Sequence, residues 1–113
     1  MALDTATAKN AAVDGLKAKI THIAVFTGTA SGAAGAEPTG VARKPITWGS
    51  STGGVTTGSV DVSGFPAGTT IQSWGGFDAL TGGNFIQGGA LTPTRASLQP
   101  TDVVTIPVTL TIV

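Results

Sequence analysis

The chain has 113 residues, the size of one ordinary domain, and folding at that size removes roughly two-thirds of the unfolded surface from water. Six Lys and Arg balance six Asp and Glu, and charged residues make up only 11% of the chain. This balance excludes the broad positive field that nucleic acid or an anionic membrane would require, so we expect neither as a partner.

Cysteine is absent, which excludes disulfides, zinc-thiolate sites and thiol nucleophiles. The N-terminal stretch has no basic start followed by an apolar segment, and no apolar run approaches the roughly 18 to 20 residues that span a bilayer. We therefore expect a soluble protein made without a signal. Seventeen glycines and abundant Thr and Val favour a β-rich, turn-rich fold. The low charge fits a protein that packs against other subunits.

The first segment, residues 1–19, holds the helix that the sequence predicts. Asp4 or Thr5 is a suitable N-cap, and Val13, Leu16 and Ile20 follow at steps of three and four. We expect a short amphipathic helix that covers one end of a sheet, with docking on a partner as the alternative.

The next stretch, "ITHIAVFTG", predicts a strand that is apolar on both faces in its second half. Ile23 and Val25 share one face, and Ala24 and Phe26 share the other. A strand of this kind belongs at the centre of a sheet. The Gly- and Ala-rich loop that follows, residues 27–41, matches neither of the usual phosphate-binding glycine patterns.

The middle of the chain consists of short strand candidates separated by turns. The first of these candidates, around residues 44–49, has Ile46 and Trp48 on one side. Pro45 lies near its start, where a missing N–H does least harm. The next elements are a turn at residues 50–54, a strand through Val60 and Val62, a turn at residues 66–68 and a strand from Thr69 to Trp74. In this order the elements predict a meander.

The last eleven residues, "VVTIPVTLTIV", give the clearest period-two pattern. The apolar positions are Val104, Ile106, Val108, Leu110 and Ile112. Pro107 removes one ladder donor, so we expect this strand to be a sheet edge or to be bulged at that residue. A free edge could also accept a neighbouring chain's strand.

These elements predict a mainly β fold: a single antiparallel β-sandwich or barrel-like domain of about six or seven strands with one short N-terminal helix. We expect residues 1–113 to form one domain, with residues 1–19 as the helical segment and residues 20–113 as the sandwich. The crossover helices that an α/β fold requires are missing from the pattern.

Residues suited to catalysis or metal binding are few. His22 is the one histidine, inside the first strand, and we expect it to be structural, because no second histidine or cysteine completes a metal site and no G-x-S-x-G motif supplies a nucleophile. The carboxylates Glu37, Asp61, Asp78 and Asp102 each stand alone, where capping of a turn is the usual role, and no calcium-loop motif is present. We therefore expect no enzyme activity, no catalytic residue, no metal and no cofactor. The basic pair Arg43-Lys44 is too small for a nucleic-acid footprint.

The two tryptophans are open to two interpretations, core packing or an exposed platform for sugars and partners. Gly75 and Gly76 follow Trp74, and such small residues let another backbone or ring approach closely. Trp74 is thus the better candidate for a partner contact than Trp48. The residues that we expect to contact a partner are Val13, Leu16, Trp74 and Phe77.

Three stretches of the sequence carry a resemblance to a known class of proteins. They are "ITHIAVFT" at Ile20 to Thr27, "ARKPITWG" at Ala42 to Gly49, and "FPAGTTIQSWGGFDALTGGNFIQGGAL" at Phe65 to Leu91. Together they resemble small virion structural proteins of tailed bacteriophages: minor capsid, head-decoration or tail-fibre-like β-sandwich proteins. The chain departs from that pattern at Ser73, where an aliphatic residue is usual, and at Gly76-Phe77, which separate the Trp from Asp78.

The resemblance implies a structural role in a virion rather than catalysis. The role we expect first is a capsid decoration or minor capsid protein on the head shell, since the chain is short and neutral and has no shaft-like repeat. The alternative is a tail-fibre or minor tail module involved in host attachment, and a host-encoded binding domain is a third possibility. The implied partners are the major capsid protein or other virion subunits, in a homo-oligomer or another multi-copy assembly.

Overall fold

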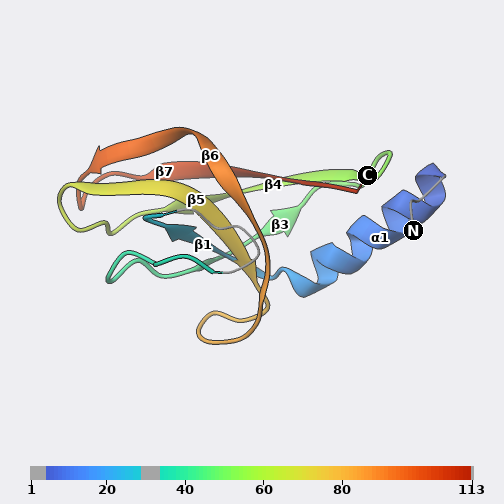
Figure 1. The fold of residues 1–113 in the computed structure, drawn as a ribbon, viewed down its shortest axis with the longest axis horizontal. Helices are drawn as coiled ribbons and strands as arrows, with labels where there is room; N and C mark the ends of the chain where they lie inside the picture. Colours follow the sequence, from blue (N-terminus) through green and yellow to red (C-terminus); the bar gives the residue numbers. More distant parts are fainter. Residues whose placement is uncertain (1–4, 29–33, 113) are drawn as a thin grey trace.

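A computed structural model of the chain describes residues 5–28 and 34–112, which form one helix and seven strands (Figure 1). The elements are α1 (Ala6–Lys19), β1 (His22–Phe26), β2 (Lys44–Pro45), β3 (Thr47–Trp48), β4 (Val55–Val62), β5 (Thr69–Phe77), β6 (Phe85–Leu98) and β7 (Val104–Thr111). The strands make two antiparallel sheets, with orders β2-β1-β5-β6 and β3-β4-β7. The mainly β fold with one N-terminal helix is confirmed.

The helix begins where the sequence predicts. The Thr5 hydroxyl oxygen accepts a hydrogen bond from the main-chain N–H of Ala8 at 3.1 Å, which makes Thr5 the N-cap. The other candidate, Asp4, lies outside the described residues. Val13 and Ile20 are buried and Leu16 is half-buried, so the predicted stripe faces the protein. Lys17 and Lys19 lie in the last turn, where the helix dipole favours positive charge.

The first strand is central, as predicted. It lies between β2 and β5, and its residues from Ile23 to Phe26 are all buried. Ile23 and Val25 join the main core between the two sheets. Ala24 and Phe26 face the other way and form a smaller cluster with Phe77.

The prediction of one strand through Ile46 and Trp48 is wrong. The chain forms two strands of two residues each, and these belong to different sheets: β2 pairs with β1, and β3 pairs with β4. Ile46 lies between them, and its N–H donates to the carbonyl oxygen of Thr21 at 3.1 Å. The segment therefore carries the chain from one sheet to the other, and Pro45, which lacks an N–H, lies on an edge strand.

The predicted meander is also wrong. β4 already has partners on both sides, β3 and β7, so the strand that follows it in the chain cannot join the same sheet beside it. β5 instead pairs with β1 in the other sheet. Phe65 lies in the connection and is fully buried in the core cluster. Burial of this ring holds the linker across the end of the two sheets.

The last strand has the alternation that the sequence predicts. Its burial follows a strict period of two from Val104 to Thr111, and its apolar side chains enter the main core. β7 is an edge strand of the three-stranded sheet, in agreement with Pro107. The other long edge is β6, which extends over 14 residues and pairs with β5 with three register shifts.

Candidate functional site

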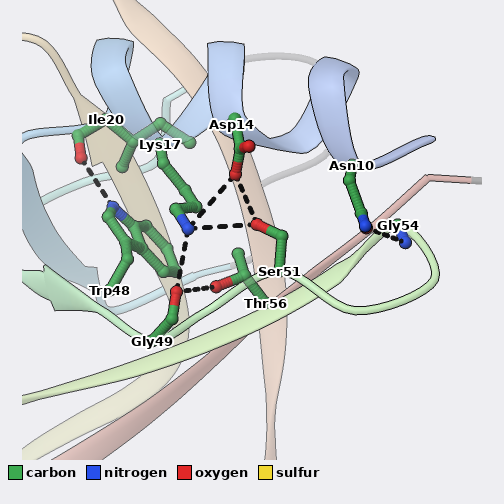
Figure 2. A network of polar contacts seen from close by, with 9 residues as sticks. All are labelled: Asn10, Asp14, Lys17, Ile20, Trp48, Gly49, Ser51, Gly54 and Thr56. Atoms are coloured by element: carbon green, nitrogen blue, oxygen red, sulfur yellow. Dashed lines mark hydrogen bonds and ion pairs between the residues drawn. The ribbon is translucent and has the colours of Figure 1, made fainter. Parts of the chain in front are cut away.

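α1 is tied to the three-stranded sheet by a network of polar contacts around the turn at residues 49–54 (Figure 2). The Lys17 ammonium donates to the carbonyl oxygen of Gly49 at 2.8 Å and to the Ser51 hydroxyl at 3.0 Å. The Ser51 hydroxyl in turn donates to the Asp14 carboxylate at 2.5 Å. Asp14 also pairs with Lys17 at 3.3 Å. The Ser51 hydroxyl first, and Lys17 second, lower the pKa of Asp14 below its usual value.

Two further contacts extend this network along the helix (Figure 2). The side-chain oxygen of Asn10 accepts a hydrogen bond from the main-chain N–H of Gly54 at 2.8 Å. At the other end, the indole N–H of Trp48 donates to the carbonyl oxygen of Ile20 at 3.0 Å. The helix is thus fixed at its middle and its C-terminal end, with Val13 packed beneath it.

Arg43 holds the tip of the β5–β6 hairpin in place. Its guanidinium makes a two-point ion pair with Glu37, at 3.2 and 3.0 Å, and donates to the carbonyl oxygens of Ala79 at 3.1 Å and Gly82 at 2.7 Å. It also stacks on the ring of Phe77, 3.5 Å from the centroid. The Arg43 side chain is only 9% exposed. This arrangement is a structural clamp, and it uses four of the five N–H donors of the guanidinium.

The third feature is a groove of about 430 Å³ between the edge strands β6 and β7. Leu16 of α1 and Trp74 of β5 contribute to its lining, and Thr109 and Thr111 line the β7 side. No residue that lines this groove is ionisable. The groove is therefore an uncharged surface between two strand edges.

The predicted contact residues lie in different environments. Val13, Trp74 and Phe77 are buried within the chain, and Leu16 is half-buried and lines the groove. Phe77 lies beneath Arg43 and packs edge-on against Phe26 and Phe85. The structure therefore brings Leu16 and Trp74 together at the groove and places Phe77 at the hairpin tip. That these residues contact a partner remains a prediction.

The close approach expected beside Trp74 is present, and the approaching groups belong to the same chain. A Cβ added at Gly75 would meet the ring of Phe26, and one added at Gly76 would lie 2.6 Å from Cγ2 of Ile20. Ser73, which replaces the usual aliphatic residue, is buried, and its hydroxyl donates to the carbonyl oxygen of Gly28 at 2.6 Å. A polar residue is tolerated there because that hydrogen bond satisfies it.

The sequence interpretation missed Arg43, which was considered only as half of a basic pair. The available signal was the pairing of one arginine with one glutamate six residues earlier, across Pro38. His22 is half-buried, and its Nδ1 lies 3.0 Å from the Thr21 hydroxyl. Within residues 5–28 and 34–112, no three His, Cys, Asp or Glu side chains gather where they could hold a metal ion. The helix in that part of the chain is too short and too polar to cross a bilayer.

Comparison with known proteins gives one family. The family model described as "Podophage GP4 fiber I protein gp80" matches residues 6–112, which is nearly the whole chain. Neither the comparison with curated proteins nor the one with solved structures gave a match. The match covers the helix, both sheets and all three features described above, and it agrees with the expected structural role in a phage particle. The chain therefore belongs to the podophage fibre I family, Gp80, and is a structural protein of the virion.

Proposed function

We propose that this protein is a non-enzymatic component of a phage tail fibre and that it acts in attachment to the host. The observation that carries the proposal is the family match over residues 6–112, because the family is described as a fibre protein. This is the role that the sequence offered as the alternative. The head-decoration role, which was expected first, has no comparable support.

The shape of the molecule is consistent with a part in a fibre. The principal extents are 46 × 26 × 22 Å, so the body is about twice as long as it is wide. In Figure 1, α1 and the C-terminal end of β7 lie at one end of the long axis. The turns after β4 and β6 lie at the opposite end. We propose that the α1 end, with the groove residues Leu16 and Trp74, contacts other virion subunits and that Val13 and Phe77 support this contact from within the fold.

We further propose that residues 1–113 act as one domain. The polar network between α1 and the turn at residues 49–54, together with the buried side chains of Val13 and Ile20, supports a helix that moves with the sandwich. A rigid unit of this kind is suited to repeated use in a larger assembly.

The proposal is tested with phage particles that lack the protein. We expect such particles to keep head shells of normal thermal stability and to adsorb poorly to host cells. Supply of the protein from a plasmid should restore adsorption. Particles that adsorb normally but lose their DNA at lower temperature than the wild type would reject the fibre role and support head decoration, because a shell-bound protein stabilises the intact shell by mass action.

A further inference from the structure

The free edge of β7 is the surface of this molecule best suited to pairing with another chain. β7 is the last strand in the order β3-β4-β7, so among residues 5–28 and 34–112 one of its sides has no strand partner within that sheet. Its residues Thr109 and Thr111 are exposed and line the uncharged groove. A strand edge that presents unpaired N–H and C=O groups is a template for addition of a further strand.

The hydrogen bonds show which main-chain groups face that free side. The N–H of Ile112 donates to the carbonyl oxygen of Gly54 at 2.9 Å, so the main chain at position 112 faces β4. Because main-chain direction alternates along a strand, the residues facing β4 are the even-numbered ones. The free side therefore carries the main-chain groups of Thr105, Pro107, Thr109 and Thr111.

The β4 side of the sheet agrees with this assignment. Thr57 lies opposite Thr109 in the register, and the carbonyl oxygen of Thr57 accepts a hydrogen bond from Gly49 at 2.7 Å, on the β3 side. The main-chain N–H and C=O groups of Thr57 and Thr109 thus point away from each other. Pro107 also fits, because its missing N–H falls on the free side and costs no bond to β4.

Proteins usually protect a free strand edge with a lysine, a proline or a bulge. β7 has no charged residue, and its one proline protects only the middle of the strand. Thr109 and Thr111 lie beyond that proline and remain open. Pro107 therefore blocks strand addition at one position of the edge, and Thr109 and Thr111 leave the next two outward-facing positions available.

We propose that this edge pairs with the same edge of a second copy of the chain, antiparallel, about a two-fold axis at Leu110. In this register Thr109 of one copy lies opposite Thr111 of the other, and each of these residues both donates and accepts, which gives four main-chain hydrogen bonds across the axis. An axis at Thr109 would instead place Thr111 opposite Pro107, where a donor is missing. Pro107 thus disfavours an axis at Thr109.

The charges of the sheet favour a second copy as the occupant. Strands β3, β4 and β7 carry a single ionisable side chain, Asp61, which lies opposite Thr105 and away from the axis. Two-fold pairing therefore brings no like charges together, and it joins the two sheets into one continuous sheet of six strands, three from each copy. This inference does not depend on where in the virion the protein lies.

The test uses two double substitutions on the full-length protein. Thr109→Lys with Thr111→Lys places like charges opposite each other across the axis, twice. Thr109→Lys with Thr111→Glu places opposite charges there instead. Both positions are exposed, so neither change should disturb the fold. The control is Thr57→Lys with Ser59→Lys, which puts two lysines on exposed positions of the interior strand β4.

Sedimentation equilibrium measures the dimer constant of each protein. We expect the wild type and the control to form dimers, the doubly lysine-substituted protein to dimerise about tenfold more weakly, and the lysine–glutamate protein to remain within a few-fold of the wild type. High salt should restore part of the lost dimerisation. A monomeric wild type, an undisturbed dimer in the doubly lysine-substituted protein, or equal loss in both edge variants would overturn the proposal.

Discussion

Individual glycines decide how closely the aromatic side chains pack in this protein. A Cβ added at Gly89 would lie 2.7 Å from the indole nitrogen of Trp74, its partner across the β5–β6 ladder. Side chains cannot approach that closely without displacement of the ring. The absence of a side chain at Gly89 therefore allows Trp74 to lie flat against β6.

This packing predicts the effect of one methyl group. Gly89→Ala should lower the free energy of unfolding by about 1 to 3 kcal/mol, the usual cost of overpacking a well-filled site. The control is Gly15→Ala in α1, where an added Cβ has no atom within 4 Å and the helix should gain about 0.5 to 1 kcal/mol. Chemical denaturation measures both changes. Equal effects of the two substitutions would contradict the packing at Trp74.

The second residue-scale prediction concerns acid stability. The main-chain N–H of Asn84 first, and its side-chain amide second, lower the pKa of Asp78 in the folded protein by donating to the carboxylate at 2.7 and 2.9 Å. Because the folded pKa lies below the unfolded value of 3.8, the contribution of Asp78 to stability is present above that pH and is lost as the pH falls through the folded pKa.

Asp78→Asn should therefore flatten the acid limb of the stability curve. Thermal melts between about pH 7 and about pH 2 should show a smaller drop in Tm below about pH 4 for the variant than for the wild type. Asp102→Asn is the control for loss of one partly exposed carboxylate. An identical acid limb in the wild type and in Asp78→Asn would show that Asn84 does not stabilise the ionised carboxylate.

At the scale of elements, the β5–β6 hairpin depends on a residue outside it. Arg43 fixes the loop at residues 79–82 through the carbonyl oxygens of Ala79 and Gly82 and through the ring of Phe77. Lysine is a point donor and cannot reproduce the planar, multi-point contact. Arg43→Lys should weaken the loop by about 1 to 2 kcal/mol.

Hydrogen exchange tests this clamp at the loop itself. Amides at residues 79–83 should exchange on the order of tenfold faster in Arg43→Lys, while those of β4 and β7 should keep their wild-type rates. Arg95→Lys is the matched control, because Arg95 is a partly exposed arginine that donates to a single carbonyl oxygen, that of Pro93. Uniform acceleration over the whole chain would point to global destabilisation instead of a local clamp.

The elements differ in how far the sequence predicts them. The alternation of β7, the central position of β1 and the Thr5 cap depend on local pattern and were predicted correctly. Two features were not predicted: the division of the segment around Ile46 into β2 and β3, and the pairing of β5 in the other sheet. Both depend on which strands pair with β4, and the local sequence pattern holds no information about that pairing. The contacts of Arg43 join residues 36 and 39 positions apart, so they too follow from topology.

At the scale of the whole molecule, the protein is an elongated sandwich with α1 fixed at one end. The polar network fixes α1 to the three-stranded sheet, and the clamp at Arg43 fixes the loop between β5 and β6. The edge of β7 is a third, separate part of the molecule and is open to a further strand. The virion role came from the resemblance carried by the β-rich stretches, whereas its assignment to a fibre came from the family match. Composition alone does not separate a head protein from a tail protein, since both assemble in many copies.

The fibre assignment is tested most directly by the position of the protein in the intact particle. A small peptide tag at the N-terminus, labelled with gold-conjugated antibody and imaged by electron cryo-microscopy, reports that position in wild-type virions. We predict label along the tail fibres, absent from particles of the deletion strain. Label distributed over the head shell, with bare fibres, would contradict the account.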